Sequence, residues 1–271
     1  MPGPIPPAEP AAALPGPLAL VVALRAERRA LSRAIGLRRP VRVAGIPLTA
    51  GRLAGREVLL VQAGIGVARA RRCLAALGRA VPLAGVWSLG YAGGLSPEAR
   101  LGDLVCPDRV LGGEAGPDLS PPTPERVERV LAGLAAAGTP AHRGALLTVG
   151  APLRTPESKR AAAARTGAVA VDMEAGGVAE AAAALGIPWL ALKVVLDPAD
   201  RDLPASLLGC TAPDGNPRWS RILRALAAGS EVRRALWAMG TASRLASAAL
   251  AAGLEPALAA WAHLDAPRSL Q

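Results

Sequence analysis

Aromatic residues are scarce in this chain of 271 residues. It has no phenylalanine, one tyrosine and five tryptophans, so aromatic residues make up 2% of the sequence. A surface that stacks single-stranded bases needs aromatic side chains, and this scarcity argues against one. No zinc-finger, RNA-recognition or helix-turn-helix pattern is present either. The sequence therefore predicts no nucleic-acid partner.

Cysteine is also rare, and Cys73, Cys106 and Cys210 stand far apart. An odd number of widely spaced cysteines is not typical of a disulfide framework or a metal site. We expect them to be small core residues in a reducing, cytoplasmic setting. No run of about 18 uncharged apolar residues occurs, which argues against a membrane-spanning helix.

Arginine carries almost all of the positive charge. The net charge is +10, the isoelectric point is about 11.1, and lysine occurs only at positions 159 and 193. Such an excess of positive charge favours anionic partners such as phosphate or lipid headgroups. Hydrophobic residues make up 51% of the chain, enough for a substantial core.

Strand and helix patterns alternate along most of the chain, which predicts an α/β fold with helices flanking a sheet. We divide the chain into a disordered Pro- and Ala-rich leader (1–17), one α/β domain (18–203) and a loop with basic C-terminal helices (204–271). Strands are expected at 18–24, 58–62, 85–89, 102–107, 144–149, 168–171 and 187–195. Helices are expected at 26–37, 67–77, within 120–139, and from 172 to about 185.

Carboxylates stand at the ends of two of these strands. Asp172, Met173 and Glu174 follow the strand at 168–171, and Asp197 follows the strand at 187–195. Ligands of α/β sheets bind at the carboxyl ends of the strands, where two carboxylates can converge on one substrate. Each of these residues taken alone could equally be a helix cap or a turn residue.

Glycine-rich turns follow two further strands. Gly64 and Gly66 lie between a strand and a helix, where a helix N-terminus favours an anion or a ribose hydroxyl. Gly90 begins a second tight turn, which continues through Tyr91 to Gly94. Together with the carboxylates, these turns predict one pocket built from four strand ends.

The tail from 218 to 264 has a helical pattern in which arginines alternate with tryptophans. Two interpretations stay open for it. The helices could pack on the sheet with their arginines in water. They could instead meet a membrane surface or a lipid-like substrate.

This set of residues fits the cleavage of a nucleoside N-glycosidic bond. The sugar becomes positively charged in the transition state, and the base leaves best when an acid protonates it. A second carboxylate can hold the ribose hydroxyls more tightly as that charge grows. Water needs a general base to attack, whereas phosphate needs cationic partners.

The motifs Gly64-Ile65-Gly66, Gly90–Leu95, Val171–Glu174 and Asp197–Asp200 occur in the order found in a known family. In this the chain resembles the nucleoside phosphorylase and methylthioadenosine/adenosylhomocysteine nucleosidase superfamily, from about residue 18 to 201. The resemblance implies a three-layer α/β/α fold around a mixed, partly closed sheet, with assembly into a homo-oligomer. It implies no organic cofactor, and inorganic phosphate stays open as a co-substrate.

The resemblance also implies roles for individual residues. Glu174 corresponds to the glutamate that binds ribose, and Met173 to the residue that packs under the sugar. Asp197 corresponds to the acid that protonates the purine. Glu27 corresponds to the glutamate that activates water in the nucleosidases.

Several positions depart from the family pattern. Ser88 and Tyr91 stand where phosphorylases keep a phosphate-binding arginine and serine. Lys193 replaces a nucleosidase arginine, and Pro152 and Leu153 stand at the aromatic base-stacking position. A phosphate site is therefore weakened. We count these residues, with Gly64, Gly66 and Gly90, among the expected substrate-binding residues.

The Pro-rich loop after Asp200 and the basic tail resemble the hopanoid-associated phosphorylase subgroup. This resemblance implies release of adenine from the lipid adenosylhopane, in the cytoplasm or at the membrane surface. Two alternatives stay open. One is a nucleosidase for methylthioadenosine, adenosylhomocysteine or futalosine. The other is a nucleoside-binding protein without catalysis.

Overall fold

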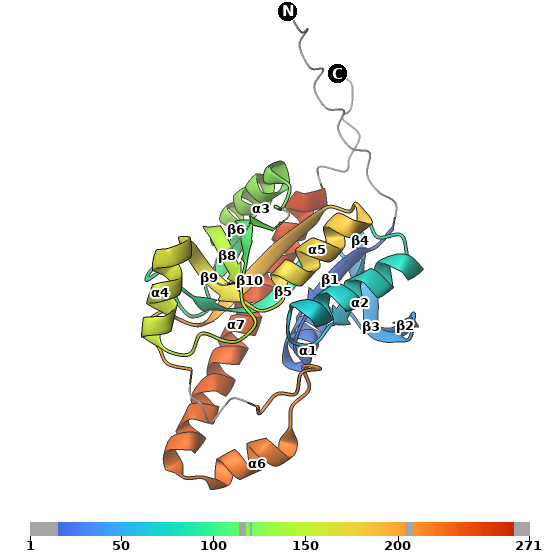
Figure 1. Cartoon of the computed structure of the whole chain (residues 1–271). Coiled ribbons are helices and arrows are strands. Elements are labelled where there is room, and N and C mark those ends of the chain that lie inside the picture. Colours follow the sequence, from blue (N-terminus) through green and yellow to red (C-terminus); the bar gives the residue numbers. More distant parts are fainter. Residues whose placement is uncertain (1–15, 114–117, 120, 204–208, 263–271) are drawn as a thin grey trace, which may run out of the picture.

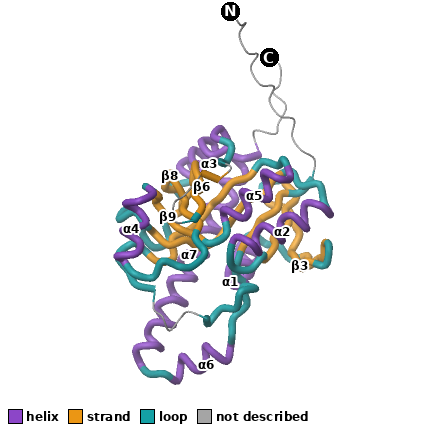
Figure 2. Tube along the Cα trace, in the orientation of Figure 1, coloured by secondary structure: helices purple, strands orange, loops and turns teal. Residues whose placement is uncertain are grey.

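A computed structural model of the chain describes residues 16–113, 118–119, 121–203 and 209–262. The predicted α/β fold is confirmed, with helices on both sides of a central mixed sheet (Figures 1 and 2). Of the predicted leader, residues 1–15 lie outside the described part of the chain.

The sheet contains ten strands in the described residues, and nine of them follow the order β10-β6-β8-β9-β5-β1-β4-β3-β2. Strand β10 also pairs with β5, so five strands (β5, β10, β6, β8 and β9) close into a ring. The bounds are β1 (Leu18–Val22), β2 (Arg39–Val43), β3 (Ile46–Leu53), β4 (Arg56–Gln62), β5 (Gly85–Gly94), β6 (Leu104–Gly112), β7 (Asp118–Leu119), β8 (Ala141–Thr148), β9 (Ala168–Asp172) and β10 (Trp189–Asp197).

Helices cover both faces of the sheet. The bounds are α1 (Arg25–Ala34), α2 (Val67–Ala80), α3 (Pro124–Ala136), α4 (Pro156–Thr166), α5 (Ala175–Leu185), α6 (Trp219–Ala227) and α7 (Ser230–Ala262). In β1, Leu18, Leu20 and Val22 point to the core under α1, α3 and α7, whereas Ala19 and Val21 point to the core under α2 and α5. This alternation is the normal period of a strand buried on both faces.

Helix α7 divides into two parts with different surroundings. Its second half contributes Leu250, Leu254, Leu258 and Trp261 to the core, all at 0% exposure. No residue from Trp219 to Leu245 is buried, so α6 and the first half of α7 form a lobe that projects from the body (Figure 1). We call residues 219–245 the helical lobe. The tail thus forms the helices α6 and α7, and the second half of α7 packs into the core.

Strands β5 and β10 extend beyond the ends that the sequence predicts. Strand β5 was expected to end at residue 89, but it continues to Gly94 because Val194 and Val195 of β10 pair with Tyr91 and Ala92. Strand β10 was expected to end at Val195, but it extends to Asp197. The expected loop at 90–94 is therefore a strand with an irregular backbone, and it carries Gly90 at φ +131°.

Candidate functional site

Glu27 is a buried carboxylate in the first turn of α1, immediately after β1. Its Oε2 accepts hydrogen bonds from the backbone N–H groups of Leu24 (2.8 Å) and Ala23 (3.1 Å), and its Oε1 accepts one from Tyr91 (2.9 Å). Burial raises the pKa of Glu27, and these hydrogen bonds and the charge of Lys193 act in the opposite direction. A buried carboxylate with a raised pKa is suited to accept a proton from water.

The irregular backbone of β5 makes room for Glu27. A Cβ atom on Gly90 would lie 2.6 Å from Glu27 Oε1. The next residue, Tyr91, turns its N–H toward the same carboxylate and its hydroxyl toward Ser243 (2.7 Å) and Ser247 (2.6 Å) of α7. The long helix α7 is thereby linked to the site.

Glu174 lies at the N-terminus of α5 and reaches across to the glycine turn after β4. Its Oε1 accepts a hydrogen bond from the backbone N–H of Gly66 at 2.8 Å. Burial, with a further contribution from the charge of Asp172, raises the pKa of Glu174 to about 7. Near neutral pH this carboxyl group can therefore change its charge state during a reaction cycle.

Asp172 and Lys193 form a buried ion pair behind these glutamates. Lys193 Nζ lies 2.9 Å from Asp172 Oδ2, and the two side chains are 1% and 0% exposed. Asp172 also accepts hydrogen bonds from Thr148 Oγ1 (2.7 Å) and the Ala175 N–H (2.8 Å). Lys193 lies close enough to Glu27 and Glu174 to act on both charges.

Asp197 is the last residue of β10, and its carboxylate pairs with Lys159 of α4. Lys159 Nζ lies 2.9 Å from Asp197 Oδ2, and the Lys159 side chain is fully buried. Burial raises the pKa of Asp197, and the Lys159 ammonium opposes this rise. The sequence analysis did not identify Lys159.

These carboxylates line one cavity of about 230 Å³. The cavity walls are mostly apolar and come from the ends of several strands. The lining residues include Glu27, Asp172, Glu174 and Asp197 among the charged groups, and Ile65, Tyr91, Pro152, Leu153, Met173 and Leu196 among the others. The predicted convergence of strand-end carboxylates is therefore present in the fold, while their catalytic roles stay predictions.

Other expected site residues lie elsewhere. Ser88 is buried within β5, and its hydroxyl makes no hydrogen bond to the described residues. At Gly64 the close approach comes from the chain itself, since a Cβ there would lie 2.7 Å from the carbonyl oxygen of Pro213. Gly66, Gly90 and Lys193 do not line the cavity, but they position the glutamates and Asp172 that do.

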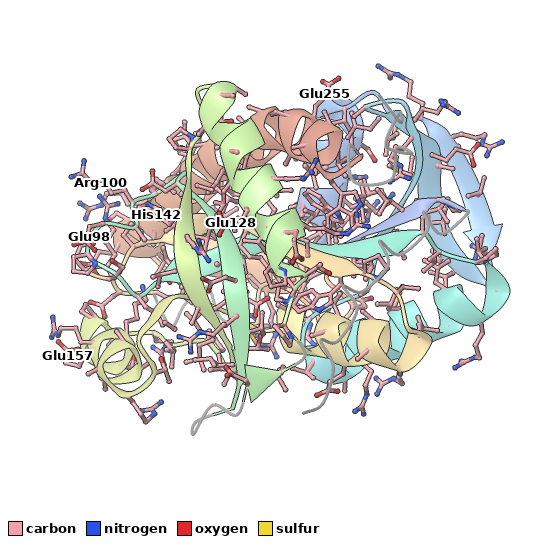
Figure 3. All side chains as sticks on the ribbon, turned by 90° about the horizontal axis from the view of Figure 1, so that it is seen from above. Glu98, Arg100, Glu128, His142, Glu157 and Glu255 are labelled. Atoms are coloured by element: carbon pink, nitrogen blue, oxygen red, sulfur yellow. The ribbon has the colours of Figure 1, made fainter. Side chains whose placement is uncertain are left out.

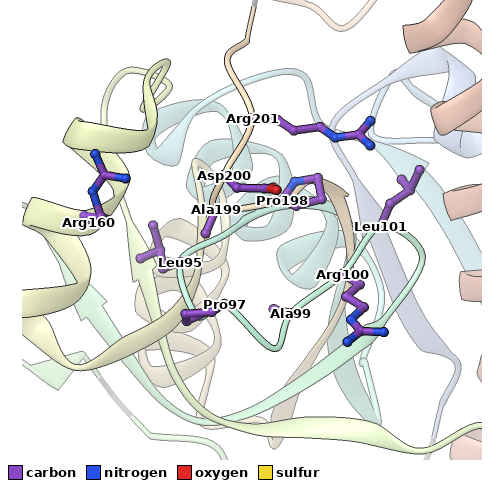
Figure 4. A pocket seen from close by; sticks show the side chains of 10 residues that line it. All are labelled: Leu95, Pro97, Ala99, Arg100, Leu101, Arg160, Pro198, Ala199, Asp200 and Arg201. Carbon is purple, nitrogen blue, oxygen red and sulfur yellow. The ribbon is translucent and has the colours of Figure 1, made fainter.

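A larger hollow of about 570 Å³ lies on the other side of the turn after Asp197 (Figure 4). It is lined by Leu95, Pro97, Ala99, Arg100, Leu101, Arg160, Pro198, Ala199, Asp200 and Arg201, and it contains none of the predicted site residues. We therefore take the smaller cavity as the candidate site. Carboxylates such as Glu98, Glu157 and Glu255 lie at the periphery in Figure 3, in contrast to the buried Glu27.

The carboxylates do not form a metal centre. Within the described part of the chain, no group of three or more His, Cys, Asp or Glu side chains is arranged to hold a metal ion. The carboxylates of the cavity instead form hydrogen bonds with backbone N–H groups or ion pairs with lysines.

The family described as "Phosphorylase superfamily" matches residues 17–228 of the chain. The chain belongs to this family. It is an enzyme of the class that cleaves N-glycosidic bonds.

Individual relatives agree with this assignment. The chain is 35% identical over 176 residues to futalosine hydrolase of Streptomyces coelicolor, which covers 55% of this chain and 72% of the relative. It is 28% identical over 196 residues to 5′-methylthioadenosine/S-adenosylhomocysteine nucleosidase of Mycobacterium bovis, covering 59% and 77%. The fold matches a Neisseria meningitidis nucleosidase in complex with methylthio-immucillin-A, with a TM-score of 0.69 and 18% identity over 90% of this chain and 99% of that one.

Proposed function

We propose that this chain hydrolyses the N-glycosidic bond of a purine nucleoside. The proposal is carried by one observation: three carboxylates from separate strand ends, Glu27, Glu174 and Asp197, line one cavity of about 230 Å³. Their chemistry divides into three roles. Glu27 accepts a proton from water, Glu174 holds the ribose hydroxyls, and Asp197 protonates the departing base.

The charges around the cavity favour water over phosphate as the nucleophile. Among the described residues, the cavity lining includes four carboxylates and no lysine or arginine. Lys193 lies behind the lining and is paired with Asp172, and Ser88 is buried in its strand. A phosphate dianion would meet repulsion here, because phosphate binding needs cationic partners. Neutral water does not.

The proposed reaction balances without any further reactant. The bond between the sugar and the base breaks, and its electron pair goes to the base. Asp197 gives a proton to the base, while water adds its oxygen to the anomeric carbon and gives a proton to Glu27. Exchange of protons with solvent then removes the proton from Glu27 and restores the one on Asp197, so that in sum water supplies a hydroxyl to the sugar and a proton to the base.

Release of the base in phosphate-free buffer tests this proposal. We expect the wild-type chain to release adenine from adenosine or 5′-methylthioadenosine without phosphate, and Glu27→Gln to lower that rate about 10²–10⁴-fold. Glu255→Gln, a change at an exposed carboxylate on α7, is the matched control and should keep the wild-type rate. Dependence on phosphate, with a sugar-1-phosphate product, would contradict the proposal.

The helical lobe favours a finer version of this function, in which the nucleoside is linked to a lipid such as adenosylhopane. The exposed large hydrophobic residues of the described chain all lie on this lobe: Trp219 (65%), Leu223 (63%), Trp237 (70%) and Leu245 (55%). The loop before the lobe contacts the rim of the cavity, since Ile65 donates its N–H to the carbonyl of Pro213. A substrate held at a membrane would thus be presented beside the site.

The charge of the lobe complements an anionic bilayer. The lobe carries Arg221, Arg224, Arg233, Arg234 and Arg244, all exposed, against the single acidic residue Glu231. A second copy of the same lobe would meet it with like charge, whereas anionic lipid headgroups attract arginines and accept tryptophan and leucine between them. None of the described helices combines the length and apolarity needed to cross a bilayer, so the interaction we propose is with the membrane surface.

Flotation with vesicles tests this finer version. We expect binding to vesicles that contain anionic lipid at low salt, and loss of binding at high salt. Arg221→Gln combined with Arg224→Gln should weaken partitioning roughly 30-fold, at about 1 kcal/mol for each basic residue. The control is Arg39→Gln with Arg42→Gln on the exposed hairpin strand β2. If both double variants lose vesicle binding equally, or if the wild type does not bind vesicles, the lipid-linked substrate is contradicted. A nucleosidase for small substrates would then be the function.

The superfamily resemblance also leads us to propose a homo-oligomer. Light scattering on the purified protein measures its mass directly, and a mass of one chain, 27.4 kDa, would contradict this proposal.

A further inference from the structure

The ammonium group of Lys159 is surrounded by oxygen atoms of a single turn. Besides Asp197 Oδ2 at 2.9 Å, its Nζ donates to the carbonyl oxygens of Pro198 (2.7 Å) and Arg201 (2.9 Å), and lies 3.3 Å from that of Asp197. A protonated amine has three N–H donors, and three short contacts use all of them. One buried lysine of α4 therefore fixes both the side chain of Asp197 and the backbone that carries it.

Lysine is a rare choice in this chain. Of 31 basic residues only Lys159 and Lys193 are lysines, and both are buried, at 0% and 1% exposure. Each is paired with an aspartate that lines the cavity. A compact ammonium fits a closed space with acceptors on three sides, whereas the planar guanidinium of arginine does not. Both lysines thus place a compact ammonium group in a closed space beside a carboxylate of the cavity.

The turn that Lys159 holds begins at the lining of the smaller cavity and continues along the larger hollow. Asp197 faces the smaller cavity, while the following residues Pro198 to Arg201 line the larger hollow shown in Figure 4. Lys159 of α4 binds both the backbone carbonyls of this turn and the carboxylate of Asp197, and so constrains the direction of the Asp197 carboxyl group.

We propose that Lys159 is a positioning residue for Asp197, which orients its carboxyl group toward the leaving base and balances the negative charge that remains on it after proton transfer. This inference rests on the proposed function of Asp197 as the acid. When the proton moves from Asp197 to the base, the carboxylate left behind lies 2.9 Å from the Lys159 ammonium. The pair stabilises that product and makes Asp197 a stronger acid than its buried position alone would allow.

Other charges also surround Asp197, and they come from every element packed around it. They are Glu27 on α1, Asp172 at the end of β9, Glu174 before α5, Lys193 on β10, Arg160 on α4, Arg100 across the hollow, and Asp200 and Arg201 in the turn itself. Among the described groups, Lys159 is the one whose charge lowers the pKa of Asp197. Removal of Lys159 should therefore act mainly through Asp197.

Lys159→Met removes the charge and keeps most of the side-chain volume. We expect the limb of the pH–rate profile that belongs to Asp197 to move to higher pH by about one unit or more, and kcat to fall by at least about tenfold. Arg160→Met is the matched control on the same helix, since its side chain is 66% exposed, and its profile should match the wild type. In the Asp197→Asn background, Lys159→Met should add little further loss.

A measurement without turnover separates this inference from the proposed function. The carboxyl carbon of Asp197, labelled with ¹³C and identified by its absence in Asp197→Asn, should titrate at higher pH in Lys159→Met than in the wild type. Lys159→Gln, which keeps N–H donors for the turn, should show the same change if the methionine variant does not fold. An unchanged titration overturns the role of Lys159 even in an active enzyme. If the titration of Asp197 moves but the protein cleaves no nucleoside, the result supports the pairing of Lys159 with Asp197 and contradicts only the proposed function.

Discussion

Gly90→Ala perturbs the proposed water-activating group without replacing any titratable residue. The added Cβ would lie 2.6 Å from Glu27 Oε1 and 3.0 Å from its Cδ, which is closer than non-bonded atoms approach. The carboxylate cannot turn away freely, because three backbone N–H groups hold it at 2.8–3.1 Å. Either Glu27 or the β5 backbone must move.

The expected magnitudes follow from this geometry. Gly90 has φ +131°, a conformation that costs an alanine about 1–3 kcal/mol. For a domain of this size, each kcal/mol lowers Tm by roughly 2–4 °C. A shift of the proposed water-activating carboxylate by about 1 Å can lower the rate about 10²-fold. We therefore expect a modest loss of Tm and a loss of kcat/KM of about two orders of magnitude.

Gly102→Ala is the control that separates strain from displacement. Gly102 has φ +90°, and a Cβ there would meet nothing within 4 Å. Adenine release and thermal melting should be measured for both variants. Both should lose Tm, but only Gly90→Ala should lose most of its activity. Equal activity in the two variants would refute the assignment of Glu27 to the reaction.

Three further predictions concern the other carboxylates. Asp197→Asn should lower turnover by about 10²–10⁴-fold with Tm close to the wild type, as measured by steady-state kinetics and calorimetry. Glu174→Gln should lower kcat and kcat/KM together, and far less with a 2′,3′-dideoxy substrate, so equal losses on both substrates would indicate a structural cap. Glu174 has a pKa of about 7 in the fold against 4.5 when unfolded; the unfolded chain therefore binds fewer protons between these values, and stability from Glu174 falls as pH rises from about 4.5 to 7. Thermal melts across that range should show this slope in the wild type and a smaller one in Glu174→Gln.

The sequence was sufficient for the strand ends that carry the site. Asp197 does end β10, and Glu174 does stand at the N-terminus of α5. These positions follow from buried apolar runs with polar residues directly after them, a pattern that depends on neighbouring residues in the chain. The alternating order of strands and helices in turn predicts the layered fold.

Features that depend on distant pairing could not be predicted. The hairpin strands β2 and β3 were missed because their turns use Ala44-Gly45 and Ala54-Gly55, in which alanine takes φ +49° and +47°. Two-residue hairpin turns usually contain asparagine or aspartate before the glycine, which makes them recognisable in a sequence. The continuation of β5 beyond residue 89 depends on β10, about a hundred residues later in the chain.

The pairing of lysines with the aspartates of the site was also not predicted. Lys159 meets Asp197 only because α4 packs beside the end of β10, and no local pattern reports that contact. The rarity of lysine in an arginine-rich chain was the available signal. A lysine that is kept in an arginine-rich chain can indicate a compact ammonium group in a closed space, and this signal applies to both Lys159 and Lys193.

Oxygen-18 labelling tests the central claim most directly. The wild-type protein should be incubated with 5′-methylthioadenosine in H₂¹⁸O, with and without inorganic phosphate, and the sugar product analysed by mass spectrometry. Hydrolysis at this site predicts one ¹⁸O atom in the free sugar, at a rate that phosphate does not change and that Glu27→Gln lowers about 10²–10⁴-fold. A sugar-1-phosphate without ¹⁸O, formed only when phosphate is present, would contradict it.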